Sequence, residues 1–150
     1  IILGSDQGRT VYKKKLINLV ERYHLNKKVK FINRCEEMPL AYSLADVVVS
    51  ASIEPEAFGR VAVESQAMSK PIIASNIGGS KETILNKKTG FLYKFDDPRE
   101  LAKSLNTVIQ LTQEELISMG KEGRKNITKK FDVETMCDTN LNEYKKLLKN

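Results

Sequence analysis

Short apolar segments alternate with helix-like segments along this 150-residue chain, and this alternation restricts the fold more than any other feature. The segments 1–3, 29–32, 46–50, 71–74 and 90–93 are rich in Ile, Val, Leu and Phe and predict strands. Strands that alternate with helices pair in parallel through right-handed crossovers. The sequence therefore predicts an α/β fold, with one Rossmann-like parallel sheet of about five or six strands and helices on both faces.

Helices are expected between these strands because apolar residues recur there every three or four positions. One helix is expected over 59–68, and Pro98 is expected at the first position of another. The residues expected to face the core are Leu16, Leu19, Val20 and Tyr23 in the first helix and Leu101, Leu105, Val108 and Ile109 in the helix after Pro98. The final helix carries Met136, Leu141, Tyr144 and Leu148, and some of this apolar surface is expected to be exposed.

The net charge of +6, from 25 Lys and Arg against 19 Asp and Glu, has more than one interpretation. It fits a solvated lysine-rich surface, and it also fits a patch that faces acidic lipid or nucleic acid. No basic stripe is interleaved with aromatic residues, so we expect no nucleic-acid partner. Apolar runs are at most three residues long, whereas about 20 residues are needed to cross a bilayer.

The cysteine and histidine content limits both the compartment and the chemistry. Cys35 and Cys137 lie far apart and form no CxxC motif, which together with the lack of a secretion signal favours the cytoplasm. His24 is the single histidine, so the chain by itself supplies no Ser-His-Asp or Cys-His nucleophile and no two-histidine metal site. We expect His24 on the surface after the first helix, and we predict no metal site.

Ligands of parallel α/β sheets bind in the loops that follow the carboxyl ends of the strands. In this chain those loops are 4–8, 33–36, 51–59 and 76–80. The loop from Gly4 to Gly8 could hold a phosphate through its backbone N–H groups, or it could be a tight structural turn. It lacks a full GxGxxG motif, so the sequence leaves both interpretations open.

The loop after the third strand is more informative. Glu56 lies in the loop, Gly59 and Arg60 lie at the start of the next helix, and Glu64 follows inside that helix. Free N–H groups and the helix dipole favour an anion at such a helix start, and Gly59 allows a close approach to the backbone. Two carboxylates beside an anion site suit a sugar nucleotide, and we expect both to project into one cleft. The alternative is that Arg60 and Glu64 only form an i,i+4 ion pair.

Several motifs together resemble one known family. They are Glu56–Glu64, Pro71–Ser75, Gly78-Gly79, Glu82 and Thr89–Leu92. In this combination they resemble the C-terminal, donor-binding domain of glycosyltransferase family 4, whose members are retaining enzymes with a GT-B fold. The resemblance covers nearly the whole chain and implies half of a GT-B fold, with residues 1–150 as a nucleotide-sugar-binding domain.

The resemblance also implies roles for individual residues. Glu56 matches the first motif glutamate, which contacts the donor sugar hydroxyls near the reacting centre, and is therefore the catalytic candidate. Glu64 matches the second glutamate, which holds the ribose hydroxyls. The positions whose backbone would lie along the sugar and diphosphate are Phe58, Gly59, Arg60 and Val61.

Two positions depart from the family pattern. Asn33 stands where Gly is common after the second strand, which affects the geometry expected for the base-binding loop. Ser69 stands where Gly is usual before Lys-Pro. If Ser69 adopts a left-handed backbone, it costs roughly 1 kcal/mol relative to Gly.

The resemblance places the remaining parts of the site before Ile1. These parts are an Arg and a Lys that bind the donor diphosphate, and an acceptor-binding N-terminal domain. We therefore expect a full-length retaining hexosyltransferase, with this chain inactive alone, no metal or other cofactor, and a glycan or lipid-linked glycan as acceptor. Peripheral association of the full-length protein with a membrane would fit the basic surface. The alternatives are a noncatalytic nucleotide-sugar-binding module and a basic interaction domain with a degenerate site.

Overall fold

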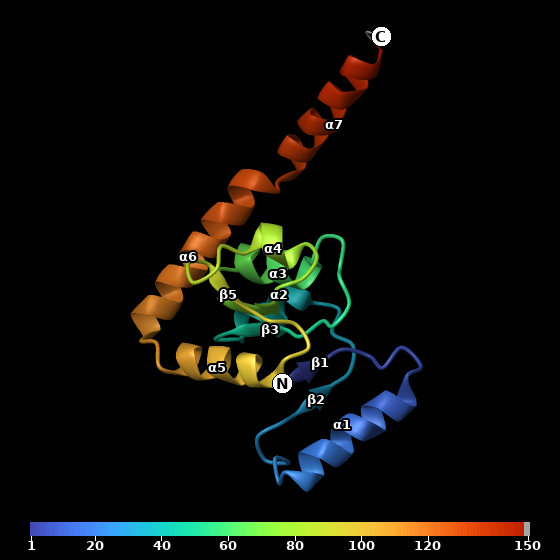
Figure 1. Ribbon diagram of the computed structural model, residues 1–150, viewed down its shortest axis with the longest axis vertical. Coiled ribbons are helices and arrows are strands. Elements are labelled where there is room, and N and C mark those ends of the chain that lie inside the picture. The colour runs from blue at the N-terminus through green and yellow to red at the C-terminus, as the bar shows by residue number, and fades with distance from the viewer. Residues whose placement is uncertain (149–150) are drawn as a thin grey trace. The chain divides into compact units, whose positions relative to one another are not determined.

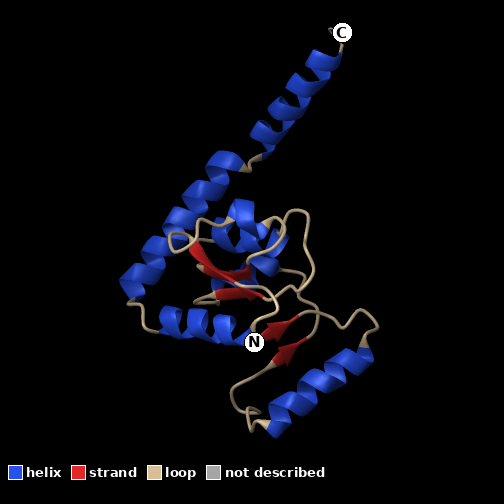
Figure 2. Cartoon of the chain, viewed as in Figure 1, coloured by secondary structure: helices blue, strands red, loops and turns tan. Residues whose placement is uncertain are grey.

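The computed structural model describes residues 1–148, which fall into two compact units (Figures 1 and 2). The first unit is Ile1–Ala41, and the second begins at Tyr42. The short helix α2 (Met38–Ser43) spans the boundary between them.

The first unit contains two short parallel strands connected by one helix. Strands β1 (Ile2–Leu3) and β2 (Phe31–Ile32) pair with Ile2 opposite Phe31, and helix α1 (Thr10–Arg22) connects them. The backbone N–H of Gly4 extends this pairing by donating to the carbonyl of Ile32 at 3.0 Å. The β-α-β order expected from the sequence is therefore present in this unit.

The inward face of α1 differs from the expected one. Leu16, Ile17 and Val20 are half-buried, whereas Leu19 and Tyr23 are 38% and 62% exposed. Tyr23 is the residue that caps the helix rather than part of its last turn, and Leu19 lies about 100° around the helix from Val20. The prediction that Leu19 and Tyr23 face the core was therefore wrong. His24 is exposed just beyond the helix, as predicted.

The second unit contains a three-stranded parallel sheet in the order β3-β4-β5. Its strands are β3 (Val48–Ser50), β4 (Ile72–Ser75) and β5 (Gly90–Tyr93). Parallel pairing and the α/β class are confirmed, but a single sheet of five or six strands was wrong, because the strand pairs make one two-stranded and one three-stranded sheet. Strands β1 and β2 are only two residues long and pair with each other, so each contributes a very short hydrogen-bonding edge.

Helices cover both faces of this three-stranded sheet (Figure 1). Ile72 and Ala74 of β4 pack with Ala62 on one side, and Ile73 packs with Val108 on the other, because successive strand side chains point to opposite faces. The covering helices are α3 (Arg60–Ala67), α4 (Ser80–Thr83), α5 (Pro98–Ile109) and α6 (Gln113–Lys130), whereas α7 (Val133–Leu147) extends away from the sheet. All four residues of β4 are buried, as is typical of a parallel strand covered on both faces.

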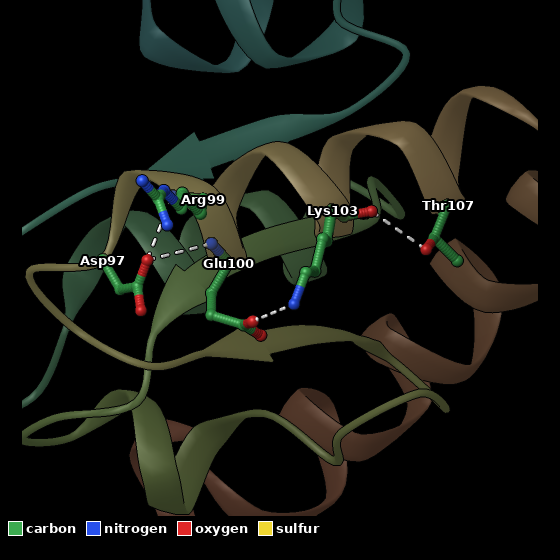
Figure 3. Close-up of polar contacts among 5 residues, drawn as sticks. All are labelled: Asp97, Arg99, Glu100, Lys103 and Thr107. Carbon is green, nitrogen blue, oxygen red and sulfur yellow. Dashed lines mark hydrogen bonds and ion pairs between the residues drawn. The ribbon is translucent and has the colours of Figure 1, made fainter.

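Helix α5 begins as its sequence predicts (Figure 3). The carboxylate of Asp97 accepts hydrogen bonds from the backbone N–H groups of Arg99 and Glu100, and Pro98 occupies the first turn. Glu100 also pairs with Lys103 at 2.5 Å on the outer surface. At the other end the prediction for Ile109 was wrong, since it is 77% exposed; it is the last residue of the helix and lies about 100° around it from buried Val108.

The end of α3 packs closely against α6. Ser69, just after α3, has a φ of 57°, so the left-handed backbone considered for this position is present. Its carbonyl lies where a side chain on Gly120 of α6 would stand, and Arg124 of α6 donates to the carbonyl of Ala67. The tight approach of the two elements therefore depends on Gly120 and on the turn at Ser69.

Helix α7 has no buried residue. Met136, Leu141, Tyr144 and Leu148 are 50–87% exposed, which confirms that the last helix leaves apolar surface open. Within residues 1–148, none of the helices has the length and apolar character that crossing a membrane requires.

Candidate functional site

The loop that carries Glu56 lies directly on the Gly78-Gly79 pair. The backbone N–H of Gly79 donates to the carbonyl of Glu56 at 2.9 Å. A side chain on Gly78 would collide with the backbone of Glu56, and a Cβ on Gly79 would stand 2.5 Å from the carbonyl oxygen of Phe58. The two glycines therefore allow a backbone-to-backbone contact that holds the loop in place.

The carboxylate of Glu56 is tied to the carboxyl end of the sheet through serines. Ser52 Oγ donates to Glu56 Oε1 at 2.5 Å, and the carbonyl of Ser52 accepts a hydrogen bond from Ser75 Oγ at 2.6 Å. Ser75 is the last residue of β4 and is buried. Glu56 itself is exposed, so its carboxylate is oriented by neighbours and open to solvent.

Gly59 begins helix α3 in a conformation that favours glycine. It has φ 74° and ψ 59°, and no side chain caps the helix start there. The carbonyl of Gly59 accepts from the N–H groups of Ala62 and Val63. The N–H groups of the first turn, together with the helix dipole, favour an anion at this end.

Of the residues near Gly59 in the sequence, Val61 faces the core and Phe58 is partly exposed. Val61 is half-buried against the apolar cluster of α3 and β4, so only its backbone is near the helix start. Phe58 is 44% exposed, and its ring meets that of Phe131 edge-on with the centroids 5.8 Å apart. Phe58 therefore connects the loop to the end of α6.

Glu64 is held from two sides. Its Oε1 accepts from Nε of Arg60 at 3.0 Å and from Nη2 at 2.7 Å, while its Oε2 accepts from the hydroxyl of Tyr42 at 3.0 Å. The i,i+4 ion pair considered from the sequence is therefore present. The Arg60 side chain is 83% exposed and that of Glu64 is 33% exposed, so the pair contributes little to stability.

Tyr42 is the residue of this group that the sequence analysis missed. It is 5% exposed, and burial, followed by its hydrogen bond to Glu64, raises the pKa of its hydroxyl above the ordinary value. A tyrosine on the inward side of a short apolar helix must find a polar partner for its hydroxyl, and this signal could have identified it. The structure thus connects α2 to α3 through Tyr42 and Glu64.

The loop after β1 is a turn with its own internal hydrogen bond. The N–H of Gly8 donates to Asp6 Oδ1 at 3.2 Å, and both Gly4 and Gly8 have positive φ values. This arrangement favours the structural interpretation of the loop. After β2, Asn33 Oδ1 accepts from Lys13 Nζ at 3.0 Å, so the asparagine at that position is tied to α1.

Metal ligands do not cluster in the described part of the chain. Among residues 1–148, no three His, Cys, Asp or Glu side chains come together as a group that could hold a metal ion. Cys35 is half-buried, Cys137 is exposed, and both are free thiols.

Comparison with known proteins identifies the family. Residues 1–126 match the family model described as glycosyl transferases group 1, and the chain belongs to this family. It is 30% identical over 124 residues to the D-inositol 3-phosphate glycosyltransferase of Corynebacterium efficiens, covering 81% of this chain and 29% of that protein. It is also 30% identical over 112 residues to spore coat protein SA of Bacillus subtilis, covering 74% and 29% respectively. The matches therefore span about three tenths of these relatives.

Solved structures agree with the family and the fold. A glycosyltransferase from Rickettsia africae superposes with a TM-score of 0.90 at 32% identity, covering 99% of this chain and 39% of that one. The Anabaena protein HepE, solved in complex with UDP-glucose, superposes with a TM-score of 0.87 at 28% identity, covering 96% and 40%.

Proposed function

We propose that this chain is the donor-binding domain of a retaining glycosyltransferase with a GT-B fold, and that it binds a nucleotide-diphospho-sugar. One observation supports the proposal: a single strand–loop–helix unit carries Glu56, oriented by Ser52, and Glu64, oriented by Tyr42, with the helix start at Gly59 between them in the chain. That combination offers hydrogen-bond acceptors for sugar hydroxyls together with an anion-binding helix end.

Each group has a distinct task in this proposal. Glu64 accepts hydrogen bonds from the ribose hydroxyls, with its carboxylate already oriented by Tyr42. The backbone N–H groups at the start of α3 stabilise the diphosphate, whose charge increases as the sugar leaves. Glu56 accepts hydrogen bonds from the donor-sugar hydroxyls near the reacting carbon. It is the residue that we propose as catalytic.

A uridine nucleotide is the first donor to test. The solved HepE complex contains UDP-glucose, which supports a UDP-hexose as the starting choice. The acceptor, a glycan or lipid-linked glycan, would be held by another domain of the full-length protein at the cytoplasmic side of a membrane. This division of labour is consistent with a chain that spans 29% of its curated relatives.

We expect the 150-residue chain alone to transfer no sugar, because the reaction requires donor and acceptor to be positioned together. Holding donor and acceptor together can supply about 7–11 kcal/mol of the barrier, and a donor domain cannot position an acceptor that it does not contact. Transfer at an equal rate by the isolated chain and the full-length protein would contradict this division.

Calorimetric titration of the full-length protein with UDP-, GDP- and ADP-sugars tests the donor site. We expect sugars of one of these three nucleotides to bind. Glu64→Gln should lower the affinity for that donor at least tenfold, because a neutral amide replaces a charged acceptor. Glu100→Gln is the matched control, since Glu100 lies on α5 and pairs with Lys103. Equal affinities of the wild type and Glu64→Gln would contradict the role of Glu64, and binding without transfer to any acceptor would favour a noncatalytic module.

A further inference from the structure

The positive charge of the chain is concentrated in the first unit. Residues 1–41 contain nine Lys and Arg and four Asp and Glu, a net charge of +5, whereas the whole chain carries +6. The second unit, which holds Glu56 and Glu64, is therefore close to neutral. The excess of basic residues needs an explanation separate from the proposed donor site.

One exposed face of α1 combines cations with apolar side chains. A shallow groove along this face is lined by Val11, Lys14, Lys15, Asn18, Leu19 and Arg22. These residues recur at spacings of three and four, so they share one side of the helix. Val11 is 81% exposed and Leu19 is 38% exposed, and the apolar side that α1 turns inward is formed by other residues.

The cations of this face have no acidic partners in the described chain. Within residues 1–148, no carboxylate lies within ion-pair distance of Lys14, Lys15 or Arg22. Other cations of the chain do have partners: Lys103 pairs with Glu100, and Lys146 pairs with Glu143. The three charges on α1 are thus available to an anionic partner.

We propose that this face of α1 docks on an anionic lipid bilayer. Lys14, Lys15 and Arg22 would contact headgroup phosphates, while Val11 and Leu19 would enter the boundary between headgroups and acyl chains. A nucleic-acid backbone would use the cations but would bury neither apolar side chain, and a lipid surface uses both. The inference is independent of the proposed donor site, because it rests on α1 alone.

Vesicle co-sedimentation tests this inference on the full-length protein. We expect binding to vesicles of phosphatidylcholine mixed with phosphatidylglycerol, and much weaker binding to pure phosphatidylcholine. The double variant Lys14→Gln/Lys15→Gln should reduce the affinity about 30-fold, since each basic residue near such a surface contributes about 1 kcal/mol. The matched control is Lys129→Gln/Lys130→Gln, which removes two adjacent exposed lysines at the end of α6 and should retain binding.

A second variant separates the apolar contribution from the charges. Val11→Ser should weaken binding at every salt concentration and leave the steepness of the salt dependence unchanged, because no charge is removed. Equal binding to both kinds of vesicle would overturn the proposal, as would equal losses in the two lysine variants. Binding of a single-stranded RNA that depends on Lys14 and Lys15, without vesicle binding, would also overturn it and would identify a nucleic-acid surface instead.

Discussion

The buried hydroxyl of Tyr42 donates a 3.0 Å hydrogen bond to Oε2 of Glu64, the carboxylate that we propose for ribose binding. The other oxygen of Glu64 is held by Arg60, whose side chain is largely exposed. A guanidinium in solvent exchanges partners readily, whereas a buried phenol does not. Tyr42 is therefore the group that determines where the Glu64 carboxylate lies.

Replacing Tyr42 with Phe should affect both stability and nucleotide binding. The variant keeps the ring and loses the hydrogen bond, so we expect the free energy of unfolding to fall by about 1 kcal/mol. Urea unfolding measures this change, and calorimetry should show weaker nucleotide binding. Tyr144→Phe is the matched control, because Tyr144 is 66% exposed on α7. Identical unfolding midpoints for the wild type and Tyr42→Phe would show that the hydrogen bond does not stabilise the fold.

The raised pKa of Tyr42 predicts a loss of stability at alkaline pH. Burial and the bond to Glu64 raise the pKa of Tyr42 above the ordinary tyrosine value of about 10. The folded chain then retains a proton that the unfolded chain releases, so the free energy of unfolding should decrease as pH rises above about 10. Urea titrations across this range should give a shallower decrease for Tyr42→Phe. Parallel pH profiles for the two proteins would contradict this assignment.

The left-handed turn at Ser69 predicts a stabilising substitution. Ser69→Gly should raise the free energy of unfolding by about 1 kcal/mol, because glycine adopts a φ of 57° without strain. Thermal and urea unfolding would measure the gain. The comparison is Ser104→Gly inside α5, where the same change should destabilise the helix instead. Loss of stability in both variants would mean that the serine at position 69 makes contacts that outweigh its strain.

The close approach at Gly79 predicts a steric effect on the candidate site. Gly79 has an ordinary φ of −61°, so Gly79→Ala introduces no backbone strain but places a methyl group against the carbonyl of Phe58. We expect a destabilisation of about 1–3 kcal/mol and weaker nucleotide binding as the loop of Glu56 shifts. Gly8→Ala is the contrasting variant, because open space surrounds Gly8 and only its φ of 81° opposes the change. It should cost about 1 kcal/mol without affecting the second unit.

Local patterns in the sequence were sufficient to predict the class of fold and the order of its elements. Segment 71–74 predicts a strand, and Pro98 predicts the start of α5, because these signals depend on neighbouring residues. The motif from Glu56 to Glu64 also identified the loop and helix that carry the candidate site. The left-handed turn at Ser69 was considered because the family that the chain resembles usually has Gly at this position, and the structure contains it.

Tertiary packing decided the features that depend on residues far apart in the chain. It separated the strands into two sheets and turned Leu19 and Ile109 outward, because pairing and burial depend on which distant surfaces meet. It brought the hydroxyl of Tyr42 to Glu64 across 22 positions of sequence, and it placed the backbone of Glu56 on Gly78 and Gly79. The sequence alone identified the two carboxylates that we propose for sugar-nucleotide binding, whereas the folded chain determined how they are oriented, since hydrogen-bond partners are chosen by three-dimensional proximity.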